Sequence, residues 1–284
     1  MVEQANLPYF DFLLALLAQN NRSVELSFGR HVHWGYWENP RLAICDDEDY
    51  ARAAEQLTTE LCSSAGVSSG DRVLDVGCGF GGTIASLNER HEDLKLTGLN
   101  LDGRQLDRAS QQAVARGNNL ISFCQGDACT LPFANNSFDR VLAVECVFHF
   151  PSRERFFKEA VRVLRPGGTL ALSDFLPSTL FKPLARLATE APSLARFQYF
   201  GRCNLRYGLG DYRKLASEVG LIVQAERNIT KHTLPTYRYL KNLLRHSASI
   251  AGITERAADL MGVVRLVAAT GLLNYYLLTF RKQI

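Results

Sequence analysis

A short apolar strand that runs directly into a glycine-rich turn constrains this chain more than any other feature. Residues 73–82 read Val-Leu-Asp-Val-Gly-Cys-Gly-Phe-Gly-Gly, with glycine at positions 77, 79, 81 and 82. Because glycine lacks a Cβ and tolerates positive φ, a nucleotide-like ligand can approach this backbone closely. The turn therefore predicts a cofactor site between a strand and a helix. Its spacing also satisfies the dinucleotide fingerprint G-x-G-x-x-G, so the turn alone leaves the cofactor open.

The residues that follow the turn weaken the dinucleotide interpretation. A dinucleotide site places a carboxylate about 20 residues further on, where it binds the ribose. Here the next apolar run, residues 94–99, ends at Asn100 instead. Asp75 lies just before the first glycine, and we expect it either to fix the turn or to reach a bound cation.

The composition indicates one elaborated globular domain. With 284 residues and 46% hydrophobic content, the chain can bury one sizeable core with insertions. Its 32 basic and 29 acidic residues are mixed along the chain, so no basic stripe is available for a nucleic acid. The seven cysteines lack paired zinc-ligand spacing. We expect them to be reduced, buried thiols of a cytoplasmic protein without a metal site.

Two apolar segments raise the question of a membrane. Residues 7–18 lack a preceding basic region and contain Asp11, which favours an amphipathic helix over a secretory signal. Residues 262–280 approach the spanning length of about 20 residues, but Arg265 and Asn274 interrupt them. We therefore expect a helix end followed by a last buried strand at 273–280. Stable membrane insertion is not expected, and a peripheral contact through the N-terminal helix stays open.

Apolar runs suited to buried parallel strands alternate with amphipathic stretches. This alternation predicts an α/β fold with a doubly wound sheet. The predicted strands are 72–76, 94–99, 120–124, 139–145, 169–174 and 221–226, and the predicted crossover helices are 83–90, 104–116, 153–164 and 211–219.

Two stretches are too long for ordinary connections, about 176–209 and 230–270. Ligands of open sheets bind beyond the carboxyl ends of the strands, where these insertions emerge. We therefore expect them to form a substrate cap. Their aromatic residues suggest a pocket for a bulky, partly apolar acceptor, and they include Phe181, Phe197, Tyr199, Phe200, Tyr207, Tyr237 and Tyr239.

Four further motifs follow the glycine turn in order: Gly126-Asp-Ala, Leu131-Pro-Phe, Asn136-Ser-Phe-Asp and Arg162-Val-Leu-Arg-Pro-Gly-Gly. With them the chain resembles the class I S-adenosylmethionine-dependent methyltransferases, in particular those that act on natural-product sugars, polyketides and prenylated quinols. The resemblance implies a seven-stranded Rossmann-like sheet whose last strand is antiparallel. It divides the chain into N-terminal helices with a cofactor lid (1–66), an S-adenosylmethionine-binding core (67–175) and the rest of the sheet with the cap insertions (176–284).

The resemblance also assigns cofactor contacts. The backbone of Gly77, Gly79 and Gly81 should pass under the methionine portion of S-adenosylmethionine. Asn100 stands where the family usually has an acidic residue for the ribose hydroxyls. Asp127 is expected to contact the adenine amino group, together with the amide of Ala128, and Leu101 is expected to line the site. Glu145 should lie near the methionine amine or the acceptor. Tyr36 belongs to an aromatic segment, 34–37, that is expected to close over the cofactor.

The chemistry of an alcohol acceptor points to His149. An aliphatic hydroxyl is a poor nucleophile until a base takes its proton, and histidine is suited to that at neutral pH. Asp174, expected at the end of the fifth strand, is predicted to orient His149 or to share its hydroxyl. The alternative is that His149 is a structural histidine.

The leading prediction is therefore an S-adenosylmethionine-dependent O-methyltransferase for a lipophilic or glycosylated secondary metabolite. Carbon methylation of a prenylated quinol or another isoprenoid is the alternative, and a non-catalytic binding subunit with the same fold is the remote one. The sequence leaves the acceptor and the oligomeric state open.

Overall fold

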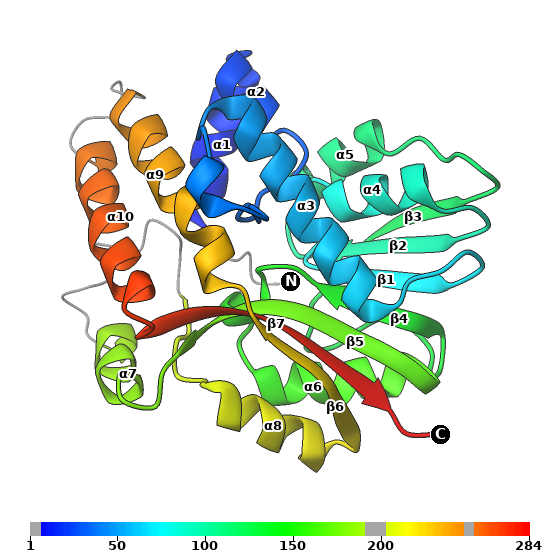
Figure 1. Cartoon of the computed structure of the whole chain (residues 1–284). Helices are drawn as coiled ribbons and strands as arrows, with labels where there is room; N and C mark the ends of the chain where they lie inside the picture. Colours follow the sequence, from blue (N-terminus) through cyan, green and yellow to red (C-terminus); the bar gives the residue numbers. More distant parts are fainter. Residues whose placement is uncertain (1–6, 191–202, 247–252) are drawn as a thin grey trace.

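The computed structural model describes residues 7–190, 203–246 and 253–284. A seven-stranded sheet runs through its centre in the order β3, β2, β1, β4, β5, β7, β6 (Figure 1). β1 to β5 pair in parallel, and β7 is antiparallel to both of its neighbours. This confirms the predicted doubly wound sheet with an antiparallel last strand. The strands are β1 (Arg72–Val76), β2 (Lys95–Asn100), β3 (Leu120–Gln125), β4 (Phe138–Ala143), β5 (Leu164–Pro177), β6 (Leu221–Asn228) and β7 (Leu273–Lys282).

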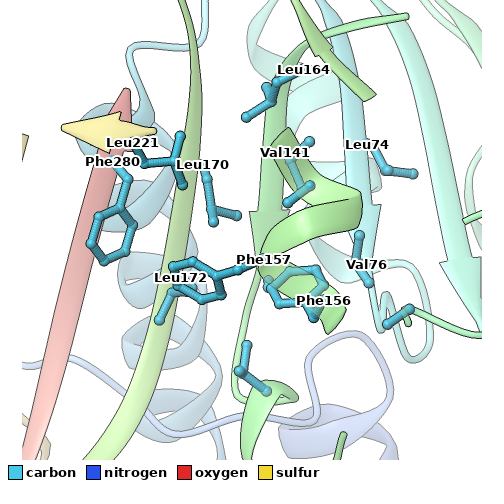
Figure 2. Close-up of a cluster of buried hydrophobic side chains, with 14 of the residues drawn as sticks. Leu74, Val76, Val141, Phe156, Phe157, Leu164, Leu170, Leu172, Leu221 and Phe280 are labelled. Carbon is cyan, nitrogen blue, oxygen red and sulfur yellow. The ribbon is translucent and has the colours of Figure 1, made fainter. Parts of the chain in front are cut away.

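The two faces of the sheet bury alternate residues of the same strands. Val73 packs with the helices on one face, whereas its neighbour Leu74 packs on the other. Because successive side chains of a strand point to opposite faces, a run that is apolar throughout is buried on both sides. Figure 2 shows the second face, where Phe156 and Phe157 pack against Leu170 and the other strand residues.

Helices cover both faces. α3 (Asp47–Ala65) and α4 (Gly82–Arg90) pack on the first face, and α6 (Arg153–Val163) and α8 (Leu209–Glu218) on the second. α5 (Gly103–Gln112) ends four residues before the predicted limit at 116. The side chain of Asn88 explains the early end, because it donates to Val114 O and accepts from Arg116 N, both bonds that a continued helix would disrupt.

A helical cap lies beside the sheet. The N-terminal helices α1 (Pro8–Ala18) and α2 (Arg22–Phe28) share one apolar cluster with α9 (Thr230–His246) and α10 (Ile253–Ala269) from the second insertion (Figure 1). The predicted lid and the predicted cap thus pack together. The first insertion contributes α7 (Lys182–Glu190), and the short 3-10 helices are η1 (Pro40–Leu42) and η2 (Val147–His149).

Candidate active site

A cleft of about 640 Å³ lies where the predicted cofactor motifs meet. It opens past the carboxyl ends of β1, β2 and β4, the position where open α/β sheets bind ligands. Nine of the predicted site residues line it: Asp75, Gly77, Gly79, Asn100, Leu101, Asp127, Ala128, Glu145 and His149.

The glycine turn forms the floor of the cleft. Gly77 and Gly79 have φ of 72° and 54°, a region that side chains other than glycine rarely adopt. A Cβ at Gly77 would lie 2.7 Å from Cys146 Cβ, whereas a Cβ at Gly79 would meet nothing closer than 3.9 Å. Gly79 therefore leaves open the space that a ligand would need.

Gly81 was predicted to lie under the cofactor, but it does not line the cleft. It caps the N-terminus of α4, and a Cβ there would approach Ala109 Cβ to 2.9 Å. Gly81 thus permits close packing of α4 against α5. Gly82 and Thr83, to which no cofactor contact was assigned from the sequence, line the cleft instead.

We expect Gly79→Val to weaken binding of S-adenosylhomocysteine by roughly 10- to 100-fold, because overpacking costs about 1 to 3 kcal/mol. Isothermal titration calorimetry measures the effect. Gly66→Val is the matched control, since Gly66 also has positive φ (67°) and open surroundings but caps α3 outside the cleft. Equal affinity in the two variants would contradict the assignment of Gly79.

Local hydrogen bonds fix the polar groups of the cleft. Asn100 Oδ1 accepts from Leu101 N at 2.8 Å, and Asn100 Nδ2 donates to Gln105 Oε1 at 2.7 Å. Asp127 Oδ1 accepts from Cys129 N at 2.8 Å. These bonds hold both side chains at strand ends, where they can present polar atoms to a ribose and a purine.

Asp75 is the buried acid of the cleft. Its side chain is 1% exposed, and Oδ2 has no hydrogen-bond partner among the described residues. Burial raises the pKa of Asp75 to about 8. Thr83 hydrogen-bonds the carboxyl of Asp75, which leaves one unpaired oxygen. A buried carboxyl with a free oxygen that lines a cleft suits a cationic ligand group. The residues present therefore fit S-adenosylmethionine, which carries an ammonium and a sulfonium.

We expect the affinity for S-adenosylhomocysteine to rise with pH towards about pH 8, by up to about tenfold per pH unit. Asp75 binds a proton in the free protein below its raised pKa, and a bound ammonium group favours the carboxylate, so binding releases that proton. Calorimetry in buffers of different ionisation enthalpy measures the release. Asp75→Asn keeps the shape and removes the titration, so an unchanged proton release in this variant would refute the interpretation.

The same raised pKa affects folding in the opposite direction. The unfolded Asp75 loses its proton near the ordinary value of 3.8, and the folded one near 8. Between these values the folded state holds the extra proton, so the contribution of Asp75 to stability decreases as the pH rises.

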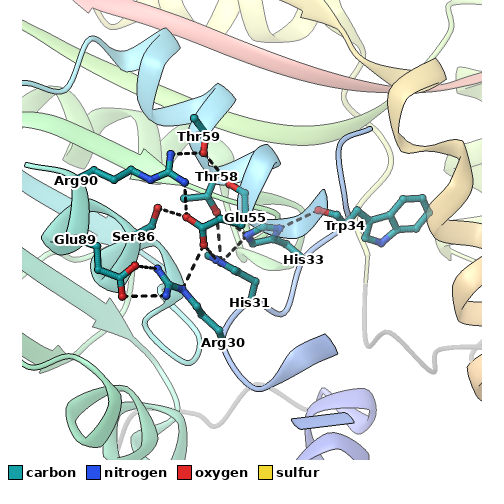
Figure 3. A network of polar contacts seen from close by, with 10 residues as sticks. All are labelled: Arg30, His31, His33, Trp34, Glu55, Thr58, Thr59, Ser86, Glu89 and Arg90. Atoms are coloured by element: carbon teal, nitrogen blue, oxygen red, sulfur yellow. Dashed lines mark hydrogen bonds and ion pairs between the residues drawn. The ribbon is translucent and has the colours of Figure 1, made fainter. Parts of the chain in front are cut away.

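A segment from Arg30 to His33 closes one side of the cleft. Figure 3 shows how a polar network holds it: His31 Nε2 lies 2.7 Å from Glu55 Oε2, and His33 Nε2 lies 3.1 Å from His31 Nδ1 and 3.0 Å from Thr58 Oγ1. Burial lowers the pKa of His33 to about 3, so His33 is neutral at physiological pH. Arg30, His31 and His33 were not among the site residues predicted from the sequence.

Tyr36 was predicted to contact the cofactor, but it does not line the cleft. Its ring stacks on His232 at 4.5 Å, and it packs with Leu57 and Leu61 of α3. The aromatic residues of this segment also have protein partners of their own. Trp34 packs edge-on against Tyr237 at 4.2 Å, so a protein side chain covers this ring without a cofactor.

A second cavity, of about 210 Å³, adjoins the cleft. Five residues line both spaces and so form the junction between them: Tyr9, Val32, His33, Glu145 and His149. Of the predicted cap aromatics, Tyr237 lines the second cavity, and Phe181, Tyr207 and Tyr239 do not. Phe197, Tyr199 and Phe200 lie outside the described residues.

Glu145 stands at this junction in a left-handed conformation, with φ of 48°. This conformation ends β4 two residues before the predicted limit of 145. Trp34 N donates to Glu145 Oε1 at 2.8 Å, and the Tyr275 hydroxyl donates to the same oxygen. Burial raises the pKa of Glu145 to about 8. Glu145 thus ties the 30–34 segment to the sheet and is protonated at neutral pH.

His149 lies in η2, directly after the β4 turn. Its backbone N donates to Cys146 O at 2.9 Å, and its ring stacks on Tyr9 of α1 with centroids 6.2 Å apart. His149 lines both the cleft and the second cavity.

Asp174 was predicted to partner His149, and the structure contradicts this. β5 continues to Pro177, so Asp174 lies inside the strand and is fully buried. Its Oδ2 accepts from Arg153 Nη2 at 2.8 Å and from the Tyr212 hydroxyl, and its Oδ1 accepts from Phe175 N at 2.7 Å. Arg153 and Tyr212 belong to α6 and α8, so Asp174 faces away from the cap.

Among the described residues, no group of three or more histidine, cysteine, aspartate or glutamate side chains is arranged to hold a metal ion. In the same part of the chain, no helix has the length and apolarity that crossing a bilayer requires.

Comparison with known proteins places this site in a family. Residues 74–172 match the model of a methyltransferase domain. The methyltransferase GfsG of Streptomyces halstedii is 33% identical, with 77% of this chain and 75% of that protein covered. The 27-O-demethylrifamycin SV methyltransferase of Amycolatopsis mediterranei is 30% identical, with 90% and 91% covered.

The fold is also shared with solved structures. One is the geranyl diphosphate C-methyltransferase of Streptomyces coelicolor A3(2), solved with S-adenosyl-L-homocysteine. It superposes with a TM-score of 0.71 at 18% identity and covers 99% of both chains.

Proposed function

The chain belongs to the S-adenosylmethionine-dependent methyltransferases, and on that premise we propose that it methylates a hydroxyl group of a bulky, partly apolar small molecule. The observation that carries the proposal is the junction between the cleft and the second cavity. An acceptor in the second cavity would meet the cofactor there, beside His149.

Each part of the junction has a task in this proposal. The bound cofactor supplies an electrophilic methyl group. The cap holds the acceptor oxygen in line with it and excludes water, which is the larger part of catalysis in a displacement of this kind. His149 takes the hydroxyl proton as the oxygen attacks.

The cofactor contacts are proposed as follows. Asn100 binds the ribose hydroxyls, and Asp127 and the Ala128 amide bind the adenine. Asp75 faces the cationic end, with Gly77, Gly79 and Leu101 lining the site. Protonated Glu145 holds the closing segment through Trp34 N and presents its carboxyl to the methyl-transfer site.

Relatives support oxygen as the acceptor atom. The rifamycin enzyme, which matches over nine-tenths of both chains, is named for O-methylation. Carbon methylation is the second candidate, because a carbon acceptor would also need an apolar cavity and a base near its reacting atom. Glu145 and His149 both stand at that place.

The test is methyl transfer from S-adenosylmethionine with a ¹³C-labelled methyl group to a panel of apolar alcohols, from decan-1-ol to macrolactone aglycones. An O-methyl carbon and a C-methyl carbon resonate in separate regions of the NMR spectrum. A labelled methyl ether is the expected product. Label on carbon would move the assignment to the second candidate, and binding without transfer to any alcohol would favour a non-catalytic subunit.

A further inference from the structure

The wall of the second cavity changes from polar to apolar along its length. Where the cavity meets the cofactor cleft, its wall includes His33, Glu145 and His149. Away from this junction, three of the cap helices supply hydrocarbon side chains: Phe12 and Leu13 from α1, Leu240 and Leu244 from α9, and Met261 and Val264 from α10. Figure 1 shows α9 and α10 side by side, with α1 beside them.

The described residues at the apolar end offer no partner for a charge. None of the described residues that line the cavity is lysine, arginine or aspartate. A phosphate, a diphosphate or a carboxylate placed there would be desolvated without compensation, which is costly. The hydroxyl groups of a sugar would likewise find few hydrogen-bond partners, because Tyr9 and Tyr237 are the only described lining residues of α1, α9 and α10 that carry a polar side-chain group.

The volume of the cavity indicates the size of the group that it can hold. A cavity of about 150 Å³ lined by aliphatic and aromatic residues binds benzene. The cavity here, at about 210 Å³, therefore accommodates a hydrocarbon group somewhat larger than benzene. Medium-length alkyl and terpenoid chains are of that size.

Resting on the function proposed above, we propose that the acceptor is neutral and hydrocarbon in the part that enters between α1, α9 and α10, with its hydroxyl at the junction beside His149. The cavity thereby rejects acceptors that carry a phosphate, a carboxylate or a sugar at that end. This selects the lipophilic acceptor over the glycosylated one that the sequence left open.

The test compares two probes of equal length on the protein saturated with S-adenosylhomocysteine. Decan-1-ol and 10-hydroxydecanoate share the hydroxyl and the chain, and differ by a charge at the far end. Both compete with the neutral fluorescent probe N-phenyl-1-naphthylamine at a pH where the carboxylate is ionised. We expect decan-1-ol to displace the fluorescent N-phenyl-1-naphthylamine. The affinity for 10-hydroxydecanoate should be at least roughly 100-fold lower than that for decan-1-ol, because an unpaired buried charge is costly.

A charge introduced at the apolar end should reverse this preference. Met261 is 2% exposed and lines the cavity. We expect Met261→Lys to increase the affinity for 10-hydroxydecanoate at least tenfold relative to the affinity for decan-1-ol. Met261→Leu, which keeps the volume of the side chain, should leave the ratio of the two affinities as in the wild type. If Met261→Lys does not fold, Val264→Lys, at a less buried position of the same wall, replaces it.

The outcomes separate the two proposals. Three results would overturn this inference. The first is equal displacement by decan-1-ol and 10-hydroxydecanoate, and the second is that neither decan-1-ol nor N-phenyl-1-naphthylamine binds. The third is a lysine variant in which the ratio of the affinities for the two alcohols is that of the wild type. S-adenosylhomocysteine binding and methyl transfer are measured on the same protein. Their absence would refute the proposed function, whereas their presence alongside any of those three results would refute the neutral-acceptor inference alone.

Discussion

Asp174→Ala should destabilise the folded protein by about 3 to 5 kcal/mol, the cost of leaving a buried charge unpaired. Arg153 loses its carboxylate partner in this variant while its side chain stays fully buried. The loss is a large share of the roughly 5 to 15 kcal/mol that stabilises a typical domain. Urea unfolding followed by circular dichroism measures it.

Two companion variants make this result specific. Glu218→Ala breaks the exposed pair with Lys214, whose charged atoms are 3.7 Å apart, and should change stability little. Adding Arg153→Met to Asp174→Ala removes the unpaired charge and should recover part of the loss. A stable Asp174→Ala protein that binds cofactor and yet turns over slowly would restore Asp174 to the orienting role that the sequence suggested.

The error over Asp174 shows what strand patterns leave undetermined. The sequence analysis predicted the fifth strand over 169–174, with Asp174 at its rim. The strand extends to Pro177, which places Asp174 inside the sheet, paired in register with Tyr276 of β7. Alternation then decides the face: Ser173 and Phe175 point to the cap side, and Asp174 points to α6 and α8. Because the predicted strand end was three residues too early, Asp174 of a buried ion pair was assigned to the active site.

The sheet itself was predictable because its signals are local. The central strands β1, β4 and β5 contain short apolar runs with buried residues, and the glycine turn fixes where β1 ends and α4 begins. Motif residues at strand ends, such as Asn100 and Asp127, fall in the cleft because parallel strands end at a common edge. Their positions depend on the sheet alone.

The side chains of the cap that face the cleft could not be predicted from sequence patterns in the same way. Tyr36 turned away from the cleft because the segment before it packs on α3. A Cβ at Gly35 would lie 2.7 Å from Ala53 Cβ, and Tyr36 N donates to Ala53 O at 2.8 Å. Such contacts join residues far apart in the chain, and the hydrophobic periodicity of the sequence does not predict them. The same holds for Tyr9, which reaches the junction only because α1 packs beside α9 and α10.

His149→Ala is expected to keep the affinity for S-adenosylhomocysteine while the rate of methyl transfer falls by roughly 10²- to 10⁴-fold, the usual contribution of a positioned base. The cofactor keeps its glycine floor, Asn100 and Asp127 in this variant, so binding and turnover should separate. His91→Ala is the matched control, because His91 caps α4 outside both cavities.

The pH dependence identifies what His149 does. A base of this kind must be neutral to accept the proton, so the wild-type rate should rise with pH as the base loses its proton. Glu145 loses its proton near pH 8, so a change in rate at that pH belongs to the carboxyl. A rise with pH that is lost in His149→Ala, while the change near pH 8 is kept, assigns the base to His149. A fully active His149→Ala protein with one transition near pH 8 would instead make Glu145 the proton acceptor and favour a carbon nucleophile.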